Sequence, residues 1–242
     1  MARVMTCAMV LAGSVTGVAG ADPVRVLLVT GGHDFEAEPF FALFEAVEGI
    51  EVEHVVQPEA NAVLASEALR GFEVIVFYDM FQETTEEQKS GLLQAMWEGV
   101  GVLALHHHLC SWEAWTEWHA ILGGHYYQVD TEVDGEVRPA CTYRHDVEIP
   151  VTVADPDHPI TRGVTDFTIV DEVYGGFYAS PDAHVLLTTD HPESGRQLAW
   201  TTQFGEGRVA YLQLGHGREA YEHPSYRTLV SNAIHWAART AE

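Results

Sequence analysis

Three consecutive histidines, His106, His107 and His108, come directly after the apolar segment 101–105. An imidazole changes protonation near neutral pH, so it can act as an acid, a base or, when neutral, a metal ligand. The apolar segment has the composition of a buried strand, and ligands of open α/β sheets bind beyond the carboxyl ends of such strands. Because successive side chains of a strand alternate between its faces, at least one of the three histidines is expected to be structural. His106 and His107 are the stronger functional candidates.

Three other apolar segments also end in polar residues that suit chemistry. His33 and Asp34 follow segment 24–29, Asp79 follows segment 72–77, and His216 follows segment 208–214. If these segments are neighbouring parallel strands, their polar side chains meet His106 at one edge of a sheet. Gly31 and Gly32 would let the backbone turn tightly and approach a ligand closely. The alternative, that all these residues only cap helices and form turns, stays open.

The elements that must position these residues alternate between strand and helix. Periodicity predicts strands at 24–29, 52–56, 72–77 and 101–105 and helices at 38–47 and 84–98. This order predicts an α/β protein with a flavodoxin-like, doubly wound and mostly parallel sheet. Strands at 185–189, 197–203 and 208–214, with a hairpin turn at 204–207, predict an antiparallel C-terminal extension before a helix at 229–238. Residues 124–180 show no clean period, and we interpret them as a partly β insertion that could lid the crevice.

The N-terminal 21 residues have the pattern of a secretory signal. Arg3 precedes a weakly apolar run, and Ala19-Gly20-Ala21 suits a signal peptidase. We expect cleavage after Ala21, export to the periplasm or the medium, and one α/β domain over residues 22–242. The run is too short and too polar for a comfortable membrane span, so no stable membrane anchor is expected.

The charge balance narrows the range of partners. With 36 acidic against 12 basic residues and a formal net charge of −24, the surface repels nucleic acid and anionic membranes. We interpret the acid excess as an adaptation to high salt or to an export compartment. Export leaves Cys110 and Cys141, which could form one disulfide, although their spacing does not establish it. The sequence does not determine the oligomeric state.

Histidines at the predicted sheet edge could also hold a metal ion. Neutral imidazoles together with a carboxylate suit zinc or another divalent first-row ion. His33, His106 and His216 form the predicted ligand set, with His107 and His125 as further candidates. No strict ligand spacing such as His-Glu-x-x-His is present, so metal-assisted and metal-free chemistry both stay open. Four other histidines are expected to be structural or solvated: His54, His145, His184 and His235.

Aromatic residues surround the predicted opening. Such residues are typical of sugar-binding sites, because the apolar faces of a sugar ring pack on them while its polar rim forms hydrogen bonds. They are Phe35, Tyr78, Phe81, Trp112, Trp115, Trp118, Tyr126, Tyr127 and Tyr174. The residues expected to bind substrate are Gly32, Asp34, Asp79, His107, Trp118, Glu172 and Tyr174. The alternative for Trp115 and Trp118, which are three residues apart, is the buried stripe of a helix.

Several short motifs resemble those of the ThuA-like family, in the family's order and over nearly the whole of residues 22–242. They are Gly31-Gly-His-Asp-Phe-Glu36, Leu105-His106, Trp118-His-Ala-Ile-Leu-Gly-Gly124, Asp157-His-Pro-Ile-Thr161, Asp171-Glu-Val-Tyr174, Leu198-Ala-Trp200, Gly205-Glu-Gly-Arg-Val-Ala-Tyr211 and Leu214-Gly-His216. The resemblance implies a class I glutamine-amidotransferase-like fold. It also implies a link to the use of trehalose and related sugars.

Amidotransferase activity itself is not expected. Enzymes of that class place a cysteine nucleophile at the elbow after a strand, where this chain has His106. Cys110 lies four residues later, and His191-Pro192-Glu193, which resembles an amidotransferase motif, lies in a predicted loop between antiparallel strands. The Gly-x-Ser-x-Gly elbow of serine hydrolases is absent from the sequence as well.

The expected function is that of an exported carbohydrate-utilisation protein. It would be a hydrolase, lyase or isomerase of a sugar or keto-sugar derivative such as a trehalose-type glycoside. His106 is the expected central acid or base, with His33 and His216 beside it. Asp34 or Asp171 would orient these histidines. The alternative is a non-catalytic saccharide-binding module with the same crevice.

Overall fold

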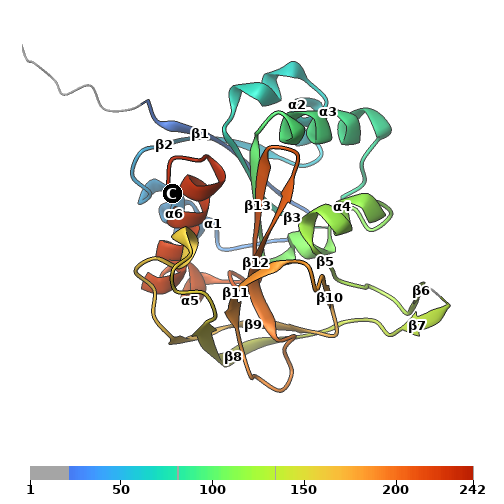
Figure 1. Cartoon of the computed structure of the whole chain (residues 1–242), viewed down its shortest axis with the longest axis vertical. Coiled ribbons are helices and arrows are strands. Elements are labelled where there is room, and N and C mark those ends of the chain that lie inside the picture. The colour runs from blue at the N-terminus through green and yellow to red at the C-terminus, as the bar shows by residue number, and fades with distance from the viewer. Residues whose placement is uncertain (1–21, 81, 134, 242) are drawn as a thin grey trace, which may run out of the picture.

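One nine-stranded sheet runs through the protein, whose computed structural model describes residues 22–241 apart from 81 and 134 (Figure 1). The strand order is β2-β1-β3-β4-β13-β12-β11-β8-β9. The expected signal segment, residues 1–21, and Phe81 lie outside the described residues.

Five neighbouring strands of this sheet are parallel. They are β2 (Ile50–Val56), β1 (Val24–Gly31), β3 (Val74–Asp79), β4 (Gly101–Leu105) and β13 (Gly207–Leu212). The loops that follow β1, β3, β4 and β13 therefore leave the sheet at a common edge, as the sequence predicts. These loops carry the three candidate catalytic histidines, His33, His106 and His216.

The other half of the sheet is antiparallel, so the sheet is mixed rather than mostly parallel. β12 (Gln197–Phe204) pairs with β13 through the expected hairpin turn, and β11 (His184–Thr188), β8 (Thr142–Val153) and β9 (Phe167–Gly175) follow. β8 and β9 come from the segment that we expected to form a lid. No clean period marks that segment because only the second half of β8 alternates, with Ile149 and Val151 buried, while its first half is exposed.

Helices cover both faces of the sheet (Figure 1). On one face lie α1 (Ala37–Glu45), α5 (Arg218–Tyr221) and α6 (Pro224–Ala237), and on the other α2 (Ala60–Leu64), α3 (Glu86–Trp97) and α4 (Thr116–Leu122). β1 shows how one strand serves both layers, because Val26 and Leu28 pack into the first core and Leu27 and Val29 into the second. A strand that is buried on both faces is apolar throughout, which is why the sequence signal for β1 is strong.

The helix ends follow local capping. α3 begins after Thr85, whose side chain forms a capping box with Gln88. α6 begins at Pro224, earlier than predicted, because proline suits the first helical position and the His223 side chain accepts a hydrogen bond from the N–H of Ser225. In the described part of the chain, no helix is long and apolar enough to cross a membrane.

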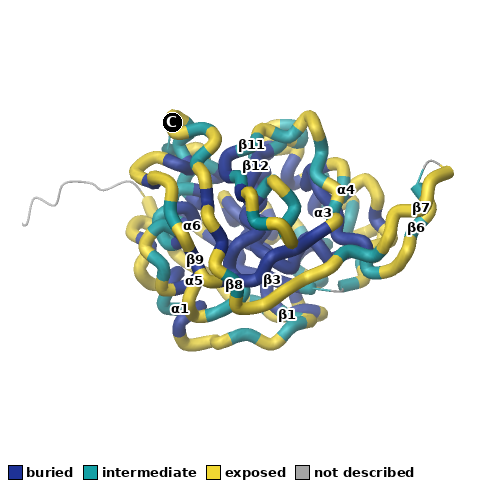
Figure 2. The backbone as a smooth tube through the Cα atoms, turned by 90° about the horizontal axis from the view of Figure 1, so that it is seen from below, coloured by how far each residue is buried: buried dark blue, intermediate teal, exposed yellow. Residues whose placement is uncertain are grey.

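Several short elements lie between the main strands and helices along the chain. They are the 3-10 helices η1 (Glu67–Gly71), η2 (His106–Cys110) and η3 (Pro159–Thr161), the strand pair β5 (Gly124–His125) and β10 (Tyr178–Ala179), and the hairpin of β6 (Thr131–Val133) and β7 (Glu136–Arg138). Figure 2 shows β3 buried in the interior and the β6–β7 hairpin reaching outward from the body. Among these short elements η2 starts at His106, the first of the three histidines.

Candidate functional site

His106 stands at a sharp turn between β4 and η2. β4 ends at Leu105, and His106 has a φ of 46°, a left-handed value that residues other than glycine rarely adopt. The hydroxyl of Tyr211 donates to the carbonyl oxygen of His106 at 2.8 Å and holds this backbone in place. The turn presents the imidazole beyond the carboxyl end of β4, much as a strained elbow presents a nucleophile.

The imidazole of His106 is fully buried and has four polar neighbours. Its Nδ1 lies 2.6 Å from the carbonyl oxygen of Gln213, which is an acceptor, so Nδ1 carries a proton. Its Nε2 faces Glu172 Oε2 at 2.8 Å, the Tyr174 hydroxyl at 2.9 Å and His216 Nδ1 at 3.2 Å. The ring is thus held in one orientation with Nε2 toward the site.

Glu172 connects the histidines of the site. Its Oε2 also lies 2.9 Å from Nδ1 of His216, and its Oε1 lies 3.6 Å from Nδ1 of His145. Burial raises the pKa of Glu172, but the contacts with His106 and His216 lower it more, so its pKa lies well below the ordinary value. Glu172 is therefore a carboxylate. For His216, burial lowers the pKa and Glu172 raises it, with a net upward shift.

Asp171 holds the loop that carries His216. Its carboxylate accepts hydrogen bonds from the backbone N–H groups of Gly215 at 2.7 Å and His216 at 2.9 Å. Burial raises the pKa of Asp171, against the opposing effects of His106 and the N–H donors. Gly215 has a φ of 118°, and a Cβ there would lie 2.2 Å from the Tyr226 hydroxyl, so the loop has no room for a side chain. Asp171 therefore holds the backbone of His216 in place.

His107 and His33 each have a ring nitrogen that is buried without a hydrogen-bond partner. Nδ1 of His107 donates to the carbonyl oxygen of Asp79 at 3.3 Å, so Nε2 bears the lone pair, and Nε2 is buried without a hydrogen-bond partner. Nδ1 of His33 is likewise buried and unpartnered, and the two ring centroids are 4.9 Å apart. Burial lowers the pKa of both histidines, which keeps both rings neutral.

These groups line a cavity of about 270 Å³. Its walls are formed by His33, Met80, His107, Cys110, Tyr126, Gln128, Tyr143, His145, Glu172 and Tyr174. Buried polar atoms are rarely left unsatisfied in proteins, and His33 and His107 each contribute one. The cavity is therefore suited to a small polar ligand that forms hydrogen bonds.

His108 is structural, as at least one of the three histidines was expected to be. Its Nδ1 donates to Asp79 Oδ1 at 2.5 Å, and its Nε2 accepts from Trp118 Nε1 at 3.2 Å. The ring stacks on Phe77 with the centroids 4.6 Å apart, and Asp79 accepts a further hydrogen bond from Gln57. Asp79 and Trp118, which the sequence suggested as substrate contacts, are fully buried and outside the cavity walls, where they hold His108 in the core.

Gly32 and Asp34, also expected at the substrate, line a separate open groove of about 760 Å³ beside β1. Gly32 has a φ of 80°, and a Cβ there would lie 1.9 Å from the carbonyl oxygen of Met80. The glycine therefore lets the loop after β1 pack against the loop after β3. Asp34 is exposed, and of this loop only His33 reaches both the groove and the cavity.

His145 belongs to the site, although the sequence placed it among the structural or solvated histidines. It lies in β8 where the register with β9 shifts between Arg144 and Val147, and Asp146 has a φ of 56°. At this bulge the His145 ring comes within 4.5 Å of the His216 ring, between centroids. The irregularity depends on pairing with β9, so no local pattern indicated it.

The predicted metal ligands are only partly brought together. Among the described residues, donor atoms of His106, Glu172 and His216 lie within 4.8 Å of one another. His33 is not in this group, and its ring centroid is 5.7 Å from that of His216. His125 stacks on His119, with the centroids 3.7 Å apart, and does not join the group either.

Both cysteines in the described part of the chain are free, so they form no disulfide with each other. Burial raises the pKa of the Cys110 thiol and that of the Cys141 thiol. Burial thus favours the protonated form of the Cys110 thiol, which is a poor nucleophile. His191-Pro192-Glu193 lies in the loop between the antiparallel strands β11 and β12, as expected.

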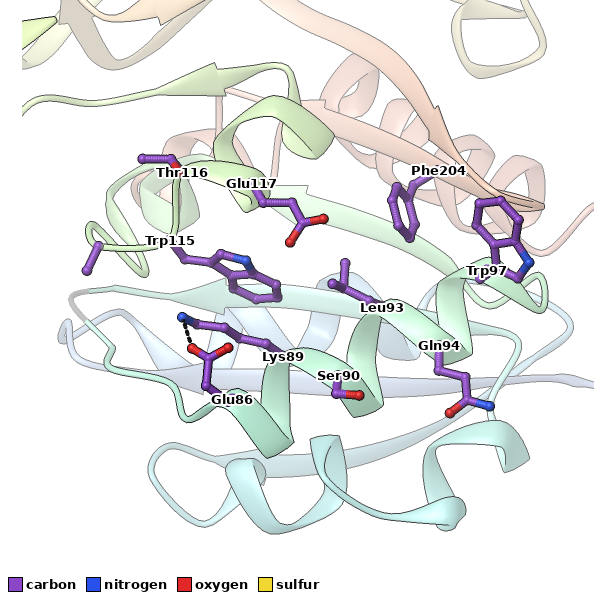
Figure 3. Close-up of a pocket in the computed structure, with 11 residues that line it drawn as sticks. Glu86, Lys89, Ser90, Leu93, Gln94, Trp97, Trp115, Thr116, Glu117 and Phe204 are labelled. Carbon is purple, nitrogen blue, oxygen red and sulfur yellow. Dashed lines mark hydrogen bonds and ion pairs between the residues drawn. The ribbon is translucent and has the colours of Figure 1, made fainter.

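A larger groove, of about 660 Å³, lies beside α3 and the start of α4 (Figure 3). Lys89 and Glu86 form an ion pair at 2.7 Å on its wall, and Trp97, which is 63% exposed, stands near Phe204. The described residues that line this groove include no histidine. In contrast to the smaller cavity, they offer no imidazole for acid–base chemistry.

Solved structures share the fold. A ThuA-like protein from Parabacteroides merdae has a TM-score of 0.76 and 18% identity, over 90% of this chain and 91% of that chain. A ThuA-like protein from Bacteroides uniformis has a TM-score of 0.69 and 19% identity, over 92% and 94%. A candidate GMP synthase component from Thermoplasma acidophilum has a TM-score of 0.52 and 12% identity, over 90% and 96%. At these identities the likeness concerns the fold alone.

The sequence itself carries the family relationship. No curated protein matches this sequence. The family model ThuA, described as trehalose utilisation, matches residues 25–237, which is most of the chain and includes every residue of the site. The chain therefore belongs to the ThuA family.

Proposed function

We propose that this protein acts on a sugar or keto-sugar derivative by proton transfer, with one sugar ring bound in the histidine-lined cavity. The observation that carries the proposal is the buried, unpartnered Nε2 of His107, a residue of the cavity wall. Because Nδ1 of His107 is committed to the carbonyl oxygen of Asp79, Nε2 is the nitrogen that accepts a proton. Membership of the ThuA family, described as trehalose utilisation, supports a carbohydrate ligand.

The size and lining of the cavity support a single sugar ring. Its volume of about 270 Å³ is just below the range for small-molecule sites, about 300–1,000 Å³. Tyr126 and Tyr174 supply aromatic surface for the apolar faces of a ring, and His33 and His107 supply nitrogens for its hydroxyl groups. A disaccharide would place only one of its rings here.

The proposed chemistry needs a proton acceptor and groups that stabilise the charge left behind. His107 is the acceptor, and its ring centroid lies 5.4 Å from that of His106. Removal of a proton from a carbon beside a carbonyl, or from a hydroxyl, leaves negative charge on a sugar oxygen. The imidazole of His216, which is paired with Glu172, would polarise that oxygen. The same step serves a lyase, an isomerase or a hydrolase of keto-sugars.

Calorimetry against trehalose, other disaccharides and their keto derivatives, followed by product analysis, tests this function. We expect turnover of at least one compound, and a loss of about 100-fold or more in His107→Leu with binding retained. The matched control is His125→Phe, which removes another buried imidazole with an unpartnered Nδ1. A saccharide that binds but stays unchanged after long incubation would make the protein a binding module instead of an enzyme.

We also propose that the protein is exported after cleavage behind Ala21. A separate proposal concerns the fold, which we infer to be the flavodoxin-like, class I glutamine-amidotransferase-like variant of the α/β class. The sequence of residues 1–21 supports export. The parallel order β2-β1-β3-β4-β13 and the likeness to a candidate GMP synthase component support the fold. Mass spectrometry of the exported protein should give a chain that begins at Asp22, and a chain that retains Arg3 would contradict cleavage.

A further inference from the structure

Three donor atoms at the centre of the site form a nearly equilateral triangle. Oε2 of Glu172 lies 2.8 Å from Nε2 of His106 and 2.9 Å from Nδ1 of His216, and the two nitrogens are 3.2 Å apart. The atoms come from β9, from η2 and from the loop after β13. Three separate segments of the chain therefore converge on one point.

Hydrogen bonds alone do not satisfy this triangle while His106 is neutral. Because the Nδ1 proton of His106 is committed to Gln213, a neutral His106 turns the lone pair of Nε2 toward the Glu172 carboxylate. A proton on Nε2 would remove this conflict, since one carboxylate oxygen accepts two hydrogen bonds, but it would place a charged ring in a fully buried position. A cation at the centre also removes the conflict, because all three atoms then direct lone pairs toward it.

The triangle also has the dimensions of a coordination site. For bonds of about 2.1 Å, two ligands at a right angle are about 3.0 Å apart, and two at a tetrahedral angle are about 3.4 Å apart. The observed edges of 2.8, 2.9 and 3.2 Å match the right angle, which is the geometry of one octahedral face. Two imidazoles and one carboxylate favour a first-row transition ion over Mg²⁺ or Ca²⁺, which prefer oxygen ligands.

Neighbouring groups brace the three side chains from outside. The Nδ1–H of His106 donates to the carbonyl of Gln213, an arrangement that orients imidazole ligands in metal sites. The Gln213 side chain donates to the carbonyl oxygen of Glu172 at 2.8 Å. The fully buried Gln213 therefore holds both His106 and Glu172 in position. Asp171 braces the third through the backbone of His216.

We propose that Nε2 of His106, Nδ1 of His216 and the Glu172 carboxylate bind one divalent first-row transition metal ion as a facial set of ligands. Glu172 lines the cavity, so the remaining coordination positions open toward it. If the protein has the function proposed above, on which this step rests, those positions bind two neighbouring oxygens of the sugar derivative, a carbonyl and an adjacent hydroxyl. The ion would then polarise the carbonyl while His107 accepts the proton.

Metal content is measured on untagged protein purified without chelator. After chelator treatment, the protein is titrated with Zn²⁺ and with Co²⁺, whose visible spectrum reports its ligands. We expect one ion per chain, and binding at least about 100-fold weaker in His216→Ala and in Glu172→Gln. The matched control is His184→Ala, which removes an imidazole from a surface pair with Asp155 and should leave metal binding unchanged.

Either of two results overturns the metal site. One is an affinity for zinc and cobalt no tighter than about millimolar, and the other is an affinity that neither ligand variant changes. The decision rests on His216 and Glu172 because loss of His106 could unfold the buried turn, and circular dichroism verifies that both variants fold. Failure of the proposed function is distinguishable. Metal binding without turnover of any sugar derivative supports the metal site and removes the function. Turnover by a protein that binds no metal ion supports the function and removes the metal site.

Discussion

The Nδ1 of His106 donates a hydrogen bond to the carbonyl oxygen of Gln213, 2.6 Å away, although 107 residues separate the two in the sequence. The contact forms because β4 and β13 are parallel neighbours in the sheet. It determines which nitrogen of His106 carries the proton and which one faces the site. His107 and His108 also donate through Nδ1, to the carbonyl oxygen and the carboxylate of Asp79, respectively. The three histidines therefore differ in the partner of Nε2.

The backbone at His106 leads to an unusual order of stability for two variants. A left-handed conformation such as the φ of 46° costs alanine about 1 kcal/mol relative to glycine. We therefore expect His106→Gly to exceed His106→Ala by about 1 kcal/mol in the free energy of unfolding, although glycine is usually the less stable choice. Urea unfolding checks the order. Equal values, or a more stable alanine variant, would mean that the turn is unstrained in solution.

Asp79 is expected to contribute to stability through His108. Asp79→Ala leaves the buried Nδ1–H of His108 without its acceptor and should lower the free energy of unfolding by about 1.5–3 kcal/mol. A double variant that adds His108→Leu removes both partners, so its cost should be smaller than the sum of the two single costs. Urea unfolding of the four proteins measures this coupling. Additive costs would argue against the pairing.

Asp171 is expected to control the loop of His216. Asp171→Ala removes the acceptor of the Gly215 and His216 N–H groups, and hydrogen bonds to a charged group contribute about 1.5–3 kcal/mol each. Amide hydrogen exchange in a peptide spanning these residues should therefore become about tenfold faster or more. Turnover should fall as His216 loses its position. A distant peptide from α3 serves as the reference. The prediction fails if, relative to that reference, the peptide exchanges as slowly in Asp171→Ala as in the wild type.

The histidine stack of His125 and His119 predicts sensitivity to acid. Burial lowers the pKa of His125 to about 3 and that of His119 to about 4, from an ordinary value of 6.5. Both histidines are therefore protonated below pH 6.5 in the unfolded chain. In the folded chain, His119 is protonated only below about pH 4 and His125 only below about pH 3. The stability of the folded state is full above pH 6.5 and falls as the pH drops through this window.

His125→Phe keeps an aromatic ring in the stack and removes one of these protonation sites. Its free energy of unfolding should decline less than that of the wild type between pH 6.5 and pH 3, by an amount on the order of a few kcal/mol. Near pH 8 the variant should lose little, because the buried Nδ1 of His125 has no partner to lose. Urea unfolding across this range tests the prediction, with the exposed His184→Ala as the control. Parallel stability curves would rule out His125 as the source of acid sensitivity.

Local sequence determined the elements and the edge at which the site forms. The apolar run of β1 predicts a strand buried on both faces, and Thr85 with Gln88 begins α3 within two residues of the predicted start. Parallel strands share one carboxyl edge, so polar residues placed directly after them had to converge. This is why His33, His106 and His216 could be named together from their positions after apolar segments.

Only the tertiary structure decided what each histidine does. His106, His107 and His108 are alike in sequence, yet Nε2 meets Glu172 in the first, remains unpartnered in the second and accepts from Trp118 in the third. Glu172 lies 66 residues from His106, and β9, which carries it, occupies the far edge of the sheet. The sequence predicts β11 and β12, but β8 and β9 lie in the segment that shows no clean period. Hydrogen bonding and charge act over a few ångströms of space, and the spacing of residues along the chain does not encode those distances.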